Sequence, residues 1–139
     1  MSISADNSEF GKKIGPRLLV IEVSPNLETS ASRRLTSSFV AKWRRANRDG
    51  VVTTRDLVTT NPPFIDEAWI KGAFAPSETH SKESVAAMKL SDSYIAELKA
   101  TDHILIGTPM HNLMAPASLK AYIDQIVRVG ATVTAGNEG

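Results

Sequence analysis

Residues 102–130 read DHILIGTPMHNLMAPASLKAYIDQIVRVG, and this stretch predicts a strand, a loop and a helix. Its strand is the continuous apolar run at 104–106, which is typical of parallel sheets that are covered on both faces. Gly107 and Pro109 end this strand. Pro116 begins the helix, because a first-turn residue needs no N–H for the helical hydrogen bonds.

We expect this helix to run from Pro116 to Val129, with Gly130 as the residue just past its C-terminus. Apolar residues recur along it at the spacing of one helical face. They are Leu119, Tyr122, Ile123, Ile126 and Val127.

The loop between strand and helix, residues 110–114, contains two methionines, a histidine and an asparagine. It leaves the carboxyl end of a strand, which is where open α/β sheets bind ligands. Side chains of these types can lie along a flat aromatic ring, so the loop is a candidate ligand site.

The rest of the chain alternates strands and helices. Apolar or β-branched runs predict strands at 18–23 and 51–57, and helical patterns predict helices that begin near Ser30 or Ser32 and at Lys82. Residues 58–81 are expected to be irregular. The alternation predicts a doubly wound parallel α/β sheet with helices on both faces. In the first helix the expected apolar stripe is Leu35, Phe39 and Trp43.

The first strand-to-helix loop, residues 24–32, is rich in hydroxyl groups. A helix N-terminus with nearby hydroxyls can hold a phosphate, because its first N–H groups have no partner within the helix. Neither a dinucleotide fingerprint nor a P-loop is present. These serines could instead only cap the helix.

The two loops together indicate a specific ligand. In a flavodoxin-like sheet with strand order 2-1-3, the first and third strands are neighbours at the switch point. One loop would then hold the phosphate and the other the ring of the same molecule. This combination favours flavin mononucleotide (FMN).

The loop segment TPMHNL, at 108–113, with the helix segment LKAYIDQ after it, resembles the flavin-ring loop of FMN-dependent NADH azoreductases. That family usually has Pro-Met-Tyr-Asn-Phe there, so His111 and Leu113 depart from its pattern. Residues 24–33, 52–57 and 90–102 resemble the family's phosphate loop, second strand and second long helix.

The resemblance implies a two-electron oxidoreductase in which NADH or NADPH reduces bound FMN, and FMN reduces a quinone or an azo compound. It also implies a homodimer with the site at the subunit boundary. The implied phosphate residues are Ser24, Ser30, Ala31 and Ser32, and the implied ring residues are Met110, His111, Asn112 and Leu113.

Family members continue with two more strands and two more helices, so we expect the C-terminal strands to be absent here. The third strand would then be an uncovered apolar edge, which invites pairing with another chain. We therefore expect a second copy, domain exchange or another partner to cover it. The alternative to an enzyme is a non-catalytic or inactive flavodoxin-like fragment, or an interaction module.

Composition excludes several other classes. The chain has 139 residues, a formal net charge of +1 and no cysteine, so we expect no thiolate metal site and no nucleic-acid or membrane partner. Residues 1–15 have no apolar run long enough for a signal peptide and are expected to be a mobile arm. Residues 16–139 would form one FMN-binding domain, with a cytoplasmic location.

Overall fold

The computed structural model describes residues 15–134 and 136. The predicted N-terminal arm, apart from Gly15, and the last residues of the predicted domain therefore lie outside the described residues. The elements are β1 (Arg17–Glu22), α1 (Ala31–Ala46), β2 (Val51–Asp56), α2 (Leu57–Thr60), α3 (Glu67–Phe74), the 3-10 turn η1 (Ser77–Thr79), α4 (Lys82–Lys99), β3 (His103–Gly107) and α5 (Ala117–Ile126).

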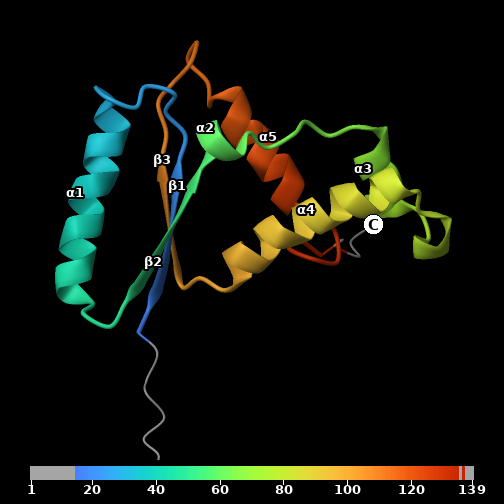
Figure 1. Ribbon diagram of the computed structural model, residues 1–139, viewed down its shortest axis with the longest axis horizontal. Coiled ribbons are helices and arrows are strands. Elements are labelled where there is room, and N and C mark those ends of the chain that lie inside the picture. Colours follow the sequence, from blue (N-terminus) through green and yellow to red (C-terminus); the bar gives the residue numbers. More distant parts are fainter. Residues whose placement is uncertain (1–14, 135, 137–139) are drawn as a thin grey trace, which may run out of the picture.

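The three strands form a parallel sheet in the order β2-β1-β3. Helix α1 lies on one side of this sheet, and α4 and α5 lie on the other (Figure 1). The predicted doubly wound, flavodoxin-like arrangement with strand order 2-1-3 is therefore confirmed. Within the described residues no further strand joins the sheet beyond β3.

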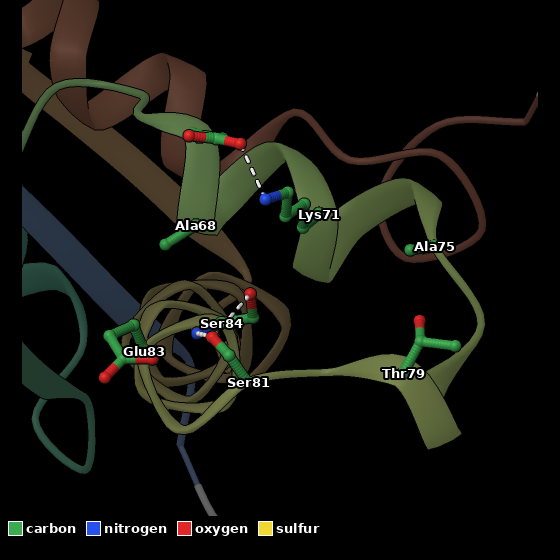
Figure 2. Close-up of a pocket in the computed structure, with 8 residues that line it drawn as sticks. Ala68, Lys71, Ala75, Thr79, Ser81, Glu83 and Ser84 are labelled. Atoms are coloured by element: carbon green, nitrogen blue, oxygen red, sulfur yellow. Dashed lines mark hydrogen bonds and ion pairs between the residues drawn. The ribbon is translucent and has the colours of Figure 1, made fainter.

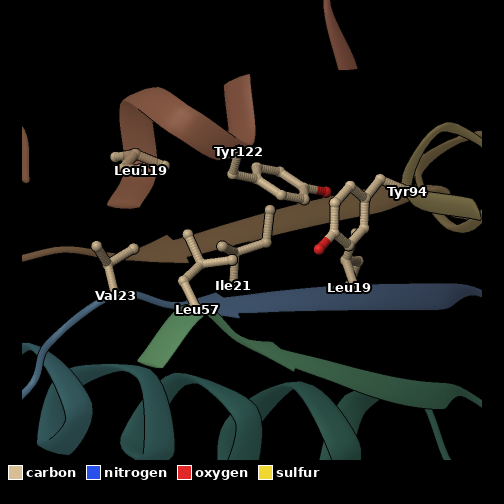
Figure 3. Close-up of a cluster of buried hydrophobic side chains, with 7 residues drawn as sticks. All are labelled: Leu19, Ile21, Val23, Leu57, Tyr94, Leu119 and Tyr122. Atoms are coloured by element: carbon tan, nitrogen blue, oxygen red, sulfur yellow. The ribbon is translucent and has the colours of Figure 1, made fainter. Parts of the chain in front are cut away.

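The central strand β1 is buried on both faces, as its continuous apolar sequence requires. Leu19, Ile21 and Val23 point toward α4 and α5 and form the main core with apolar residues of those helices (Figure 3). Two aromatic rings in this core, Tyr94 and Tyr122, pack edge to face with their centroids 5.4 Å apart. The remaining members of the cluster are Leu57 and Leu119.

The prediction that residues 58–81 are irregular is wrong. Asp56 and Asp66 cap two short helices, α2 and α3, by accepting hydrogen bonds from the N–H groups of Val58 and Trp69. Helices of four and eight residues are too short to show a helical period in the sequence. Trp69 is buried, whereas Phe74 is exposed.

The predicted C-terminus of the last helix is also wrong. Helix α5 ends at Ile126, three residues before the predicted Val129. The Arg128 N–H donates to the Thr132 hydroxyl at 3.0 Å, and Gly130 (φ 79°) lies in the turn between them. This local turn takes over the hydrogen bonds that another helical turn would have made.

The expected apolar stripe of α1 is present but not buried. Leu35 is 71% exposed and Phe39 is 47% exposed, and Thr36 is the only buried residue of α1. Ile104 and Ile106 of β3 are also about half exposed, at 50% and 46%. The exposure of α1 and of β3 has the same reason, because the described chain places no element beyond the outer edge of β3.

Candidate functional site

A cleft of about 530 Å³ lies at the carboxyl edge of the sheet, where the loop after β1 and the loop after β3 meet. Because β1 and β3 are neighbours, the fold brings together two segments more than 75 residues apart in sequence. The lining residues are Ser24, Pro25, Asn26, Thr29, Ser30, Ala31, Ser32, Leu35, Thr108, Pro109, Met110 and His111.

The serines on the first side of the cleft are held by local hydrogen bonds. Ser30 is the N-cap of α1, and its Oγ accepts from the Arg33 N–H at 3.2 Å. The same Oγ lies 3.0 Å from the Ser32 hydroxyl. Ser24 is buried at the end of β1, and its Oγ accepts from the Asn26 N–H at 3.3 Å. The capping role of Ser30 is thus real, and it places both hydroxyls at the start of a sixteen-residue helix.

Asn26 shapes the middle of this loop. Its side-chain oxygen accepts from the N–H groups of Glu28 and Thr29, at 3.2 and 2.9 Å. Its amide nitrogen donates to the Thr29 hydroxyl at 2.7 Å. Asparagine commonly organises turns in this way. These hydrogen bonds within the loop define its shape without a ligand.

The loop after β3 ends in a tight reverse turn. His111 and Met114 exchange two backbone hydrogen bonds of 2.9 Å. Asn112 and Leu113, between them, both have positive φ, at 48° and 63°. A left-handed conformation is uncommon for leucine, and such strain tends to occur at functional loops. Leu113 is 85% exposed at the tip of this turn.

The structure places six of the eight predicted site residues in the cleft lining. Asn112 and Leu113 are the exceptions, because they form the exposed tip of the turn. The six are Ser24, Ser30, Ala31, Ser32, Met110 and His111.

The cleft lining also contains Asn26 of the first loop and Leu35 of α1. The sequence did not predict either residue as a ligand contact. Its helical spacing to Phe39 predicted that Leu35 is a core residue. The structure shows instead that Leu35 and Phe39 lie on an exposed face of α1. Thr108 also lines the cleft, one residue after the end of β3.

A buried carboxyl group lies beside the start of the second loop. Glu22, at the end of β1, is 8% exposed, and one of its oxygens accepts a hydrogen bond from Thr36. Its other oxygen has no hydrogen-bond partner among the described residues. A Cβ placed on Gly107 would lie 3.0 Å from that oxygen and 2.4 Å from Thr36 Cγ2. A side chain at position 107 would therefore force Thr36 to shift, which favours glycine there.

A second cavity of about 550 Å³ lies between α3, η1 and the start of α4 (Figure 2). Two pairs of its polar groups bind one another: Lys71 Nζ is 2.6 Å from Glu67, and the Ser84 N–H donates to Ser81 at 3.2 Å. This cavity lies away from both predicted loops. Among the described residues there is no cluster of metal-ligating side chains, and no helix there is long and apolar enough to cross a membrane.

A parallel sheet in 2-1-3 order, with a hydroxyl-lined helix start and a methionine- and histidine-bearing loop meeting at the switch point, defines a flavodoxin-like class of protein. The chain belongs to the family described as having the flavodoxin-like fold, whose model matches residues 16–139.

Several known proteins are similar to this chain. It is 47% identical over 124 residues to FMN-dependent NADH:quinone oxidoreductase 8 of Burkholderia lata, covering 89% of this chain and 59% of that protein. It is 44% identical to FMN-dependent NADH:quinone oxidoreductase 2 of Jannaschia sp., covering 89% and 61%. Among solved structures, an azoreductase from Bacillus anthracis str. Sterne superposes with a TM-score of 0.82 at 27% identity, covering 89% and 61%. The chain thus spans about three fifths of the length of these relatives.

Proposed function

We propose that this chain binds FMN in the cleft between its first and third loops and works in an FMN-dependent NAD(P)H oxidoreductase that reduces quinones or azo compounds. The observation that carries this proposal is the cleft itself, in which a hydroxyl-lined helix start faces a methionine- and histidine-bearing loop. The names of the similar proteins agree with this ligand and this activity.

The phosphate of FMN would occupy the start of α1. The N–H of Arg33 is already bound to Ser30, but Ala31 and Ser32 also line the cleft and belong to the first helical turn. The N–H groups there, the positive end of the helix dipole and the hydroxyls of Ser24, Ser30 and Ser32 form a donor set suited to a phosphate.

The flavin ring would lie along the loop after β3. Met110 is 67% exposed at the cleft, and His111 lines it beside Thr108 and Pro109. Asn112 and Leu113 would contact the ring only if the turn at the loop tip folds over it. FMN held there beside Met110 and His111 would supply two-electron chemistry between NAD(P)H and the substrate, and the protein would bind and orient it.

The functional unit proposed here is a homodimer with the site at the subunit boundary. Support comes from the exposed apolar side chains at the cleft mouth, since Leu113 and Met114 are 85% and 72% exposed. Exposed apolar groups of this size commonly mark a contact surface. The use of NAD(P)H as the electron donor supports a cytoplasmic location.

The test is a flavin titration of the purified chain, followed by FMN fluorescence quenching. The Ser30→Ala/Ser32→Ala double variant is expected to bind FMN at least about 100-fold more weakly, since each of its two lost hydrogen bonds to a charged group contributes about 1.5–3 kcal/mol. The matched control is Ser37→Ala/Ser38→Ala, two exposed serines of the same helix outside the cleft lining.

Thermal unfolding of both double variants separates ligand contacts from helix capping, because the loss of the Ser30 cap costs about 1 kcal/mol. Equal FMN affinity in the two double variants would place the phosphate elsewhere. A folded chain that takes up no flavin would favour the alternative, a non-catalytic flavodoxin-like fragment or interaction module.

A further inference from the structure

The guanidinium of Arg33 joins the first loop to the end of β2. Its Nε and one Nη donate to the Ser24 carbonyl at 3.0 and 2.7 Å. Its two Nη atoms donate to the two carboxylate oxygens of Asp56 at 2.7 and 3.0 Å. The Arg33 and Asp56 side chains are only 17% and 22% exposed. This is a bidentate arginine–carboxylate pair, which fixes the relative orientation of the two side chains in addition to pairing their charges.

Arg33 holds both ends of the loop that would surround the phosphate. Its guanidinium binds the carbonyl of Ser24, where the loop begins, and its backbone N–H binds the hydroxyl of Ser30, where the loop ends. Asp56 is itself anchored, because one of its oxygens also accepts from the Val58 N–H at 3.0 Å and caps α2. The loop is therefore tied to β2 as well as to its own strand and helix.

In this geometry the positive charge of Arg33 is paired with the carboxylate of Asp56. The hydrogen bonds from Arg33 hold the pKa of Asp56 below its ordinary value, and those to Asp56 raise the pKa of Arg33. The neighbouring Arg34 differs: it is exposed, and its contact with the Thr29 carbonyl is long, at 3.4 Å.

We propose that Arg33 and Asp56 are positioning residues for the phosphate of FMN, and that Arg33 acts by shaping the loop rather than by contacting the phosphate. This inference rests on the proposed function. The competing arrangement has Arg33 swing toward the ligand and pair with the phosphate directly. The two arrangements predict opposite effects when Asp56 loses its charge.

The deciding measurement is the FMN affinity of Asp56→Asn. If Arg33 positions the loop, the neutral side chain weakens the link and raises the Kd for FMN by about tenfold, as expected when a charge-assisted hydrogen bond is lost. If Arg33 binds the phosphate directly, the freed guanidinium lowers the Kd. Asp56→Glu keeps the charge and is expected to bind FMN more tightly than Asp56→Asn.

Arg33→Gln and its double variant with Asp56→Asn complete the test. We expect both to bind FMN as weakly as Asp56→Asn alone, because residues that act as one unit are not additive. Arg34→Gln removes the same charge one position away and is expected to bind FMN like the unmodified chain. Riboflavin, which lacks the phosphate, is expected to bind equally well to Asp56→Asn and to the unmodified chain, which a general loss of structure would not allow.

The outcomes separate the two proposals. An unmodified chain that binds no FMN overturns the proposed function and this inference with it. An unmodified chain that binds FMN, with Asp56→Asn binding equally or more tightly, overturns this inference alone. Equal weakening of FMN and riboflavin binding by Asp56→Asn would also overturn it, because the pair would then support the fold and not the phosphate site.

Discussion

The indole Nε1 of Trp69 donates a hydrogen bond of 3.0 Å to the side-chain oxygen of Gln125, and both residues are buried. The Gln125 amide nitrogen in turn donates to the Pro63 carbonyl at 3.0 Å. The Gln125 backbone carbonyl accepts from the Ser91 hydroxyl at 2.6 Å. One glutamine of α5 thus ties α4, α3 and the segment before α3 together. This network holds α3 and the segment before it against α5.

Replacing Gln125 with leucine is expected to lower the free energy of unfolding by about 2–3 kcal/mol. The substitution leaves the buried Trp69 N–H without its acceptor, which costs about 1–3 kcal/mol, and it also removes the hydrogen bond to the carbonyl of the exposed Pro63. Urea unfolding followed by Trp fluorescence measures the change. Adding Trp69→Phe to Gln125→Leu should recover part of the loss, and a Gln125→Leu variant as stable as the unmodified chain would contradict the assignment.

For Tyr122, in contrast to Gln125, we expect that removing the polar group does not destabilise the fold. Its ring is buried in the main core, and its hydroxyl has no hydrogen-bond partner among the described residues. Tyr122→Phe removes a polar atom that gains nothing from the fold, so we expect unchanged stability or a gain of up to about 1 kcal/mol. Thermal unfolding at neutral pH provides the measurement. A loss above about 1 kcal/mol would mean that the hydroxyl has a partner.

Tyr122 also predicts how the chain responds to alkali. Burial raises the pKa of Tyr122 from 10.0 to about 12 in the folded state. Folding therefore favours the neutral phenol, and this stabilisation is complete below pH 10 and is lost as pH rises from 10 toward 12. Tyr122→Phe should make the alkaline decline of stability less steep in that range. Identical pH profiles for the two proteins would contradict a raised pKa at Tyr122.

The Arg33–Asp56 pair predicts a dependence on acid. Because hydrogen bonds from Arg33 lower the pKa of Asp56 from 3.8, the pair stabilises the fold fully above that value and less as pH falls through the lowered pKa. We expect Asp56→Asn to cost about 1–2 kcal/mol at neutral pH, the contribution of a hydrogen bond to a charged group at a partly exposed site. The difference from the unmodified chain should shrink below pH 4. A difference independent of pH would show that the carboxylate charge does not matter.

Two exposed apolar surfaces are candidates for the self-association that we expect. The outer edge of β3 exposes Ile104 and Ile106, and such an edge is a template for pairing with another strand. The loop tip exposes Leu113 and Met114 at the cleft mouth. We expect the chain to be at least dimeric in sedimentation experiments at micromolar concentration.

Lysine substitutions decide which surface holds the copies together. Ile106→Lys should dissociate a complex formed through β3, and Leu113→Lys should dissociate one formed at the cleft mouth. Val85→Lys, at an exposed apolar position of α4, is the matched control and should leave the mass unchanged. If the unmodified chain sediments as a stable monomer, self-association through either surface is contradicted.

Sequence alone determined the three strands and the two loops that form the cleft. Each of these follows from a local pattern: an apolar run in β1, a hydroxyl-rich loop before α1 and a proline at the start of α5. The strand order 2-1-3 was expected from the flavodoxin-like type of sheet and not from a local pattern. Six of the eight predicted site residues line the cleft for this reason, since loops that follow neighbouring parallel strands must meet at one edge.

Tertiary structure decided what local patterns do not encode. The helical stripe of Leu35 and Phe39 specifies an apolar face, but the neighbours of that face decide whether it is buried, and beyond β3 the described chain supplies none. Likewise, nothing in the spacing of Arg33 and Asp56 announces their pairing, because the two residues are 23 positions apart and meet only when β2 aligns beside β1. The network around Gln125 arises in the same way. Contacts between distant segments depend on how the elements pack, and that packing is a property of the whole fold.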